Sequence, residues 1–171
     1  MRIIKKVTID EIEKHLLLLG GGNHPDNMKQ VYEFQNRYLA ELTKDDYLNL
    51  VFLDSPSTKE LIQIAKIRTL KKMGEAANTL NGKKLGTNWD LTKIISDTKI
   101  FLETTQGLVK FPAFLLRSSK NDESKLGDWY LQDGSHRALG YAMYLLDNTV
   151  DYTIQQTYIV ADKELIIENV A

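Results

Sequence analysis

The chain of 171 residues has the length of one domain, and its 22 basic and 23 acidic side chains give a formal net charge of -1. This balance lacks the basic excess that is typical of proteins that coat nucleic acids. Cysteine is absent, which excludes thiolate catalysis, thiolate metal ligands and disulfide bonds. No apolar run approaches the ~20 residues of a membrane span, and no signal-peptide pattern follows the basic start, so we expect a cytoplasmic protein without a membrane partner.

The N-terminal part of the chain predicts one strand and two helices. β-branched residues over positions 3–9 indicate a short strand, and Asp10 can cap a helix over residues 11–19 that a run of glycines ends. Pro25 and Asp26 are typical of the start of a second helix. The apolar residues that follow recur at helical spacing and predict a helix that reaches Leu42: Met28, Val31, Tyr32, Tyr38, Leu39 and Leu42.

The middle of the chain predicts further helices. Residues 47–53 are apolar enough to be buried, and helix and strand remain alternatives for them. An amphipathic stretch over residues 61–73 predicts one helix that ends near Gly82. Another helix is expected over residues 91–102, capped by Thr87 or Asn88 and stopped by Gly107. Residues 25–105 together are therefore expected to form a helical insertion.

After Gly107 the pattern becomes rich in strands. Strands are expected over residues 108–116, 128–132, 152–160 and 165–170, with a helix over 135–146. Residues 1–10 and 106–171 would then form a strand-rich core. We expect an α+β fold, a small mixed sheet with the helical insertion packed against it. One domain is expected, because the strand-rich part alone is too small to bury a good core.

The segment Asp133-Gly134-Ser135-His136-Arg137 carries the most chemistry, because it joins a predicted strand to a predicted helix. The first amides of a helix have no partner within the helix, and the helix dipole adds positive charge there, so this position suits an anion. Gly134 lets a phosphate approach the backbone and permits a positive φ. Ser135 can cap the helix or donate its hydroxyl, and His136 can donate from its ring. Arg137 offers a planar fork to two phosphate oxygens.

Asp133 would repel a phosphate directly, so it needs another role. It could orient His136 or Arg137, hold a divalent cation, or accept a proton from a hydroxyl group. The same segment also suits an ordinary turn and helix cap that binds nothing, with Arg137 in solvent. Local chemistry leaves the phosphate site and the plain turn as alternatives.

The order of motifs from Gly107 to Val160 resembles the ParB/sulfiredoxin-like fold. That pattern is a glycine, a proline-led apolar strand, a hairpin, and then D-G-x-H-R at the start of a helix with small residues. The proline-led strand of this chain is Phe111-Pro112-Ala113-Phe114-Leu115-Leu116, and the small residues of the helix are Ala138 and Ala142. The resemblance does not extend to the helical insertion.

The resemblance implies a bound nucleotide. Its members include nucleotide-dependent sulfinic acid reductases, free-serine kinases, CTP-hydrolysing partition proteins and proposed nucleases, which hold nucleotide phosphate at this turn. The reductases need a cysteine where Ser135 stands, and the partition proteins have a DNA-binding segment for which residues 151–171 leave no room. Kinase-like members add an upstream carboxylate, for which Glu11 is better placed than Glu103.

We therefore expect a phosphotransferase or phosphohydrolase, a kinase or a nucleotide hydrolase. The nucleotide would be ATP or CTP, with Mg²⁺ on its phosphates, although another phosphorylated small molecule is also compatible. The expected catalytic residues are Asp133, His136, Arg137 and Glu11, and the expected nucleotide-binding residues are Gly107, Gly134, Ser135, His136 and Arg137. The histidines lack metal-ligand spacing, so no separate metal site is expected.

The alternative is a DNA-associated ParB-like module of a phage or mobile element. It would use a basic face on the helical insertion, for which the candidates are Arg37, Arg68, Lys71 and Lys72. A third alternative is an adaptor that binds other proteins and keeps only a vestigial site.

Overall fold

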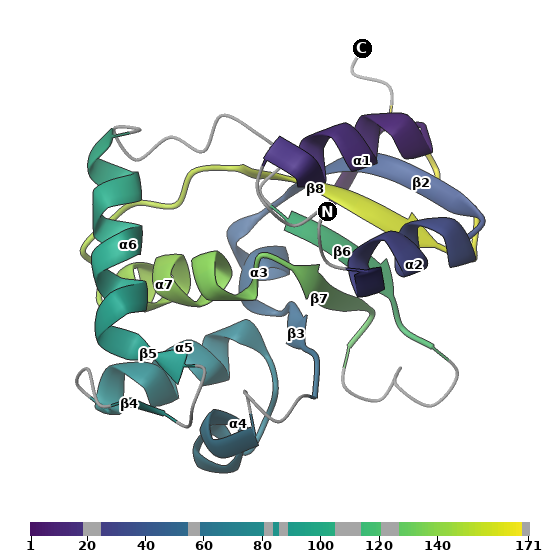
Figure 1. The fold of residues 1–171 in the computed structure, drawn as a ribbon. Helices are drawn as coiled ribbons and strands as arrows, with labels where there is room; N and C mark the ends of the chain where they lie inside the picture. The colour runs from purple at the N-terminus through teal and green to yellow at the C-terminus, as the bar shows by residue number, and fades with distance from the viewer. Residues whose placement is uncertain are drawn as a thin grey trace.

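The computed structural model describes residues 1–18, 25–54, 59–80, 84–85, 89–104, 114–120 and 127–168. These residues form a six-stranded mixed sheet in the order β1-β2-β8-β6-β7-β3 (Figure 1). Its strands are β1 (Arg2–Lys6), β2 (Asn36–Leu42), β3 (Val51–Phe52), β6 (Phe114–Ser118), β7 (Trp129–Asp133) and β8 (Gln155–Ala161). The α+β class expected from the sequence is confirmed.

Side chains alternate along the strands, so apolar residues lie on both faces of this sheet, and helices cover both faces. Leu115 and Tyr158 pack against α1 (Ile9–Leu18) and α2 (Pro25–Glu33) in one apolar cluster. Their neighbours Leu116 and Ile159 belong to the larger cluster on the opposite face. That cluster includes α7 (Ser135–Leu146), which packs against α5 (Leu70–Thr79) and α6 (Leu91–Thr104). The remaining elements are α3 (Lys44–Leu48), α4 (Lys59–Ala65), β4 (Lys84–Leu85) and β5 (Trp89–Asp90).

The expectation of a purely helical insertion over residues 25–105 is wrong, because this segment supplies two strands of the sheet. Helix α2 ends at Glu33, and β2 follows and pairs with β1 and β8. Burial along β2 has a period of two: Tyr38, Ala40 and Leu42 are buried on the α7 side. The Nε of Arg37 donates to the carbonyl of Val31 at 2.7 Å, which satisfies an oxygen near the end of α2.

Several other boundaries also differ from the expectation. The cap of α1 is Thr8 and not Asp10: the Thr8 hydroxyl accepts from the amide of Glu11 at 3.2 Å, and the Glu11 carboxylate accepts from the amide of Thr8 at 2.8 Å. The single helix expected over residues 61–73 is divided into α4 and α5, with Lys66 at φ 63° between them. Residues 165–168 are not a strand, and the end of that expected strand lies outside the described residues.

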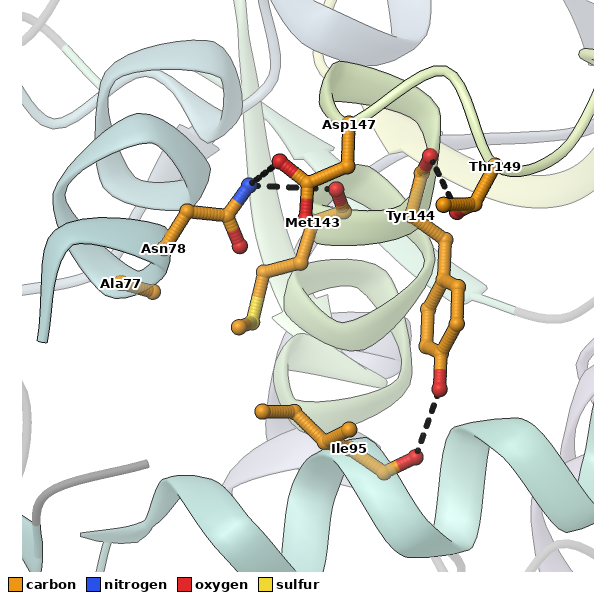
Figure 2. A pocket seen from close by; sticks show the side chains of 7 residues that line it. All are labelled: Ala77, Asn78, Ile95, Met143, Tyr144, Asp147 and Thr149. Carbon is orange, nitrogen blue, oxygen red and sulfur yellow. Dashed lines mark hydrogen bonds between the residues drawn. The ribbon is translucent and has the colours of Figure 1, made fainter. Parts of the chain in front are cut away.

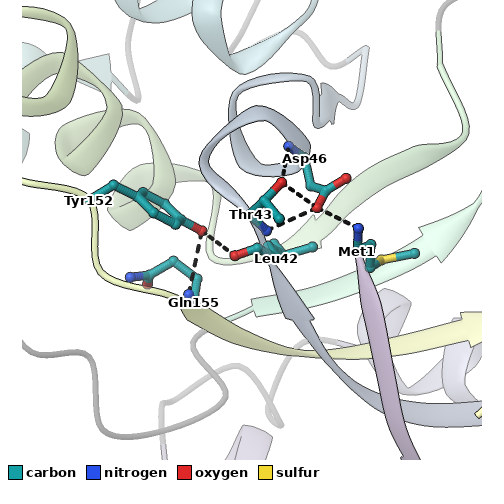
Figure 3. Close-up of polar contacts among 6 residues, drawn as sticks. All are labelled: Met1, Leu42, Thr43, Asp46, Tyr152 and Gln155. Atoms are coloured by element: carbon teal, nitrogen blue, oxygen red, sulfur yellow. Dashed lines mark hydrogen bonds and ion pairs between the residues drawn. The ribbon is translucent and has the colours of Figure 1, made fainter. Parts of the chain in front are cut away.

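A polar cluster fixes the junction between β2 and α3 (Figure 3). Thr43 and Asp46 form a capping box at the start of α3, and the Met1 ammonium pairs with the Asp46 carboxylate. The Tyr152 hydroxyl donates to the carbonyl of Leu42 at 2.6 Å. These contacts hold α3, and with it Tyr47, against the first turn of α7, where the Tyr47 hydroxyl donates to the carbonyl of Ala138 at 2.7 Å.

Candidate functional site

The turn between β7 and α7 has the order of elements that the sequence predicted. Strand β7 ends at Asp133, Gly134 adopts φ 88° and ψ 16°, and α7 begins at Ser135. This left-handed conformation is costly for a residue with a Cβ atom, which explains glycine at this position. Gly134 is the N-cap and has no side chain that could bond the first amides of α7. The proposed capping role of Ser135 is therefore wrong, since Ser135 is the first residue within the helix.

Asp133 lies at the centre of a small hydrogen-bond network. The guanidinium of Arg137, four residues further along the chain, donates to Asp133 Oδ2 at 3.4 Å. On the other side, the Asn27 amide donates to Asp133 Oδ1 at 3.1 Å. The Gln132 amide donates to Asn27 Oδ1 at 3.4 Å. Among the roles left open for Asp133, this geometry favours the orientation of Arg137.

Arg137 is partly withdrawn from solvent. Its side chain is 37% exposed and that of Asp133 19% exposed. Burial lowers the pKa of Arg137, and the Asp133 carboxylate and nearby Tyr47 act in the opposite direction. A partly desolvated guanidinium interacts more strongly with an anion than one fully in water, because the surrounding dielectric constant is lower.

His136 lies in surroundings different from those of Arg137. Neighbouring helical residues point about 100° apart, and Lys93 of α6 lies near His136, whereas the Asp133 carboxylate and the neutral Tyr47 phenol lie near Arg137. Burial, with a smaller contribution from Lys93, lowers the pKa of His136 below its ordinary 6.5. The binding of one phosphate by both His136 and Arg137 therefore stays a prediction.

The lowered pKa of His136 predicts a pH dependence of stability. The unfolded chain takes up the proton near the ordinary value of 6.5, before the folded protein does. The contribution of neutral His136 is therefore complete above that pH and decreases as the pH falls through it. We expect the free energy of unfolding of the native protein, minus that of His136→Gln, to decrease as the pH falls from about 7.5 to about 5. Urea denaturation at several pH values measures it, and a difference independent of pH would contradict the assignment.

Glu11 does not join the turn. It lies on α1, which covers the opposite face of the sheet from α7. Its carboxylate accepts hydrogen bonds from Lys5 Nζ at 2.8 Å and from the amide of Thr8 at 2.8 Å. These bonds, that of Lys5 first, lower the pKa of Glu11. Glu11 caps a helix here, and we do not retain it as a general base.

The other two upstream residues give no better candidate. Glu103 is exposed on α6 and lies 3.8 Å from the ammonium of Lys99, as expected for a solvated helix pair. Gly107, expected to contribute to nucleotide binding, lies outside the described residues.

The sequence interpretation missed Asn27 and Tyr47. Asn27 is only 3% exposed and shares the buried side of α2 with Val31. An amide on an otherwise apolar helical stripe was the available signal, because a buried amide needs hydrogen-bond partners. Tyr47 is fully buried, and nothing near it in sequence indicated that it would contact α7.

Three of the four basic residues considered for DNA binding make structural contacts, and the fourth, Lys71, is exposed on α5. Arg37 donates to carbonyl groups at the end of α2, Arg68 lies 3.9 Å from Asp54, and Lys72 pairs with a neighbouring glutamate at 2.7 Å. These contacts do not favour a basic groove on this part of the chain. Within the described ranges, no three histidine, aspartate or glutamate side chains are grouped so that they could hold a metal ion. Nor does any helix in those ranges have the length and apolarity required to traverse a bilayer.

Comparison with known proteins adds no relative. No protein-family model matches the chain, and searches of curated proteins and of solved structures find no match. The resemblance to the ParB/sulfiredoxin-like fold stays a prediction from the order of motifs.

Proposed function

We propose that this protein binds the phosphate of a nucleotide at the turn between β7 and α7, and that it transfers or hydrolyses a phosphoryl group there. One observation carries the proposal: a partly buried Arg137 is held by Asp133 beside a left-handed Gly134 at the start of a helix. A guanidinium, helix amides and an approachable backbone are the groups that bind phosphate.

The Asp133–Arg137 pair is compatible with a bound anion. A guanidinium has five N–H groups, and the pair with Asp133 uses one nitrogen, so the remaining donors can face phosphate oxygens. Arg137 and the Asn27 amide offset the charge of Asp133, which weakens its repulsion of the phosphate. Ser135, the first residue of α7, carries a hydroxyl that can donate to the same anion. ATP or CTP and Mg²⁺ belong to this proposal as the nucleotide and its counter-ion, and we derive no step through the metal.

A thermal-shift panel tests this proposal. Nucleoside triphosphates and diphosphates, with and without Mg²⁺, are added to the native protein. A nucleotide at about 100 times its dissociation constant should stabilise the fold by roughly 2.7 kcal/mol, which is roughly 5–10 °C for a chain of this size. Arg137→Ala is expected to lose most of that shift. Arg137→Lys should recover only a part of it, because an ammonium group lacks the planar fork.

Arg2→Ala is the matched control. Arg2 also pairs with an acid, Glu41, but it lies on β1 at the opposite edge of the sheet from β7 and β3. Its removal changes the net charge equally and should leave the nucleotide shift intact. Equal shifts for the native protein and Arg137→Ala, or none with any nucleotide, would remove the proposed site.

A further inference from the structure

A small cavity lies at the C-terminal end of α7 (Figure 2). Gly134 lies at the other end of this helix, as its N-cap. Its volume is about 180 Å³. One water molecule occupies about 30 Å³ of the liquid, so the cavity has room for a group of about six non-hydrogen atoms. Helix α5, helix α6 and the end of α7 with the turn after it line this space through Ala77, Asn78, Ile95, Met143, Tyr144, Asp147 and Thr149.

The polar donors around this cavity are already engaged with the protein. The Asn78 amide nitrogen donates to Asp147 Oδ1 at 2.8 Å and to the carbonyl of Met143 at 3.2 Å, which uses both of its hydrogens. The Thr149 and Tyr144 hydroxyls donate to backbone carbonyls at 2.9 Å and 3.4 Å. The groups left for a ligand are acceptors, among them Asn78 Oδ1 and the second carboxylate oxygen of Asp147.

The charge at this end of α7 is negative. Asp147 is the C-cap of α7, where the helix dipole contributes partial negative charge. None of the lining residues is basic, and within the described part of the chain Asp147 forms no ion pair. The lining also includes the apolar side chains of Ala77, Ile95 and Met143. Acceptors, a carboxylate and apolar lining residues are complementary to a cation with a short hydrocarbon part.

We propose that this cavity binds a small organic ammonium ion. The ammonium group donates to the Asp147 carboxylate and to Asn78 Oδ1, and the alkyl part contacts Ile95 and Met143. This site is separate from the proposed phosphate site and does not depend on it.

A series of matched small ligands tests this proposal on the full chain. The probe is n-butylammonium, with 1-butanol as its neutral counterpart and butyrate as its anionic one. Titration of ¹⁵N-labelled protein with n-butylammonium should give saturable shifts at the amides of Asn78, Asp147 and Thr149. We expect 1-butanol to bind at least about tenfold more weakly and butyrate not to bind, because each leaves the carboxylate without a cation. Equal binding of 1-butanol and n-butylammonium, or no saturable shift, would overturn the proposal.

Asp147→Asn is the matching variant. It keeps an oxygen that can accept from the Asn78 amide and removes only the charge. We expect this variant to weaken the binding of n-butylammonium at least about tenfold. Asp151→Asn removes the same charge from an exposed neighbour outside the cavity and should leave the affinity unchanged. Unaltered affinity in Asp147→Asn, with the dispersed amide spectrum of a folded protein, would also overturn the proposal.

Discussion

Replacing Tyr47 by alanine is expected to lower the free energy of unfolding by about 4 kcal/mol, as for other large aromatic residues removed from a core. The Tyr47 ring is fully buried between Phe114, Tyr141 and Tyr152, with ring centroids 5.6 to 5.9 Å away. Its hydroxyl also bonds the carbonyl of Ala138 in the first turn of α7. A loss of this size is a large part of the total stability of a typical domain.

Tyr47→Phe separates the ring from the hydroxyl. It keeps the packing and removes the bond to Ala138, so we expect a loss of only about 1 kcal/mol. Urea denaturation of the three proteins measures both differences. A Tyr47→Ala protein whose free energy of unfolding is within about 1 kcal/mol of the native value would contradict the placement of Tyr47 in the core.

Gly140→Ala is expected to lower the free energy of unfolding by about 2 kcal/mol, through overpacking where α6 crosses α7. A Cβ atom at position 140 would lie 1.9 Å from Thr98 Oγ1 and 2.9 Å from Thr98 Cβ. Thr98 is itself buried, so relief requires the two helices to move apart. Alanine has a helix propensity better than that of glycine by about 1 kcal/mol, which offsets only part of this cost.

Gly74→Ala is the control for Gly140→Ala. It also adds a methyl group to a helix packed on α7, but its new Cβ would meet the flexible end of Leu146 at 2.8 Å and Ala142 Cβ at 3.4 Å. Leu146 can move, so the gain in helix propensity should leave Gly74→Ala within about 1 kcal/mol of the native protein. Adding Thr98→Ala to the Gly140→Ala protein should restore part of the free energy of unfolding that Gly140→Ala loses. Equal stability of the two alanine variants would contradict the close crossing of α6 and α7.

Local signals explain which parts of the fold could be predicted. The helix expected over residues 135–146 has the observed bounds, because a glycine precedes it and its apolar residues recur without interruption. Strand β2 was missed because Tyr38, Leu39 and Leu42 fit a helical period, although Tyr38, Ala40 and Leu42 also fit an alternating one. Both strands that pair with β2 lie far from it along the chain, as in the Ile3–Ala40 and Tyr38–Ile159 registers, so no neighbouring residue indicated the strand.

Local signals also indicated some contacts of the candidate site and missed others. The Asp133–Arg137 contact joins residues only four positions apart across the turn into α7, and the orientation of Arg137 was among the roles that the sequence left open for Asp133. The Asn27–Asp133 bond joins residues 106 positions apart, and only the fold brings them together. Glu11 was assigned by resemblance to a family, although Thr8 and Glu11 have the spacing of a capping box. That local signal was the better guide.

A nucleotide titration of ¹⁵N-labelled protein tests the phosphate site most directly. ATP and CTP, with and without Mg²⁺, are added while the backbone amide resonances are followed. The proposal predicts saturable shifts that are largest from Gly134 to Arg137, with a shift of the Asn27 side-chain amide, and their loss in Arg137→Ala. Saturable shifts confined to other parts of the chain, or no shift at the start of α7, would contradict it.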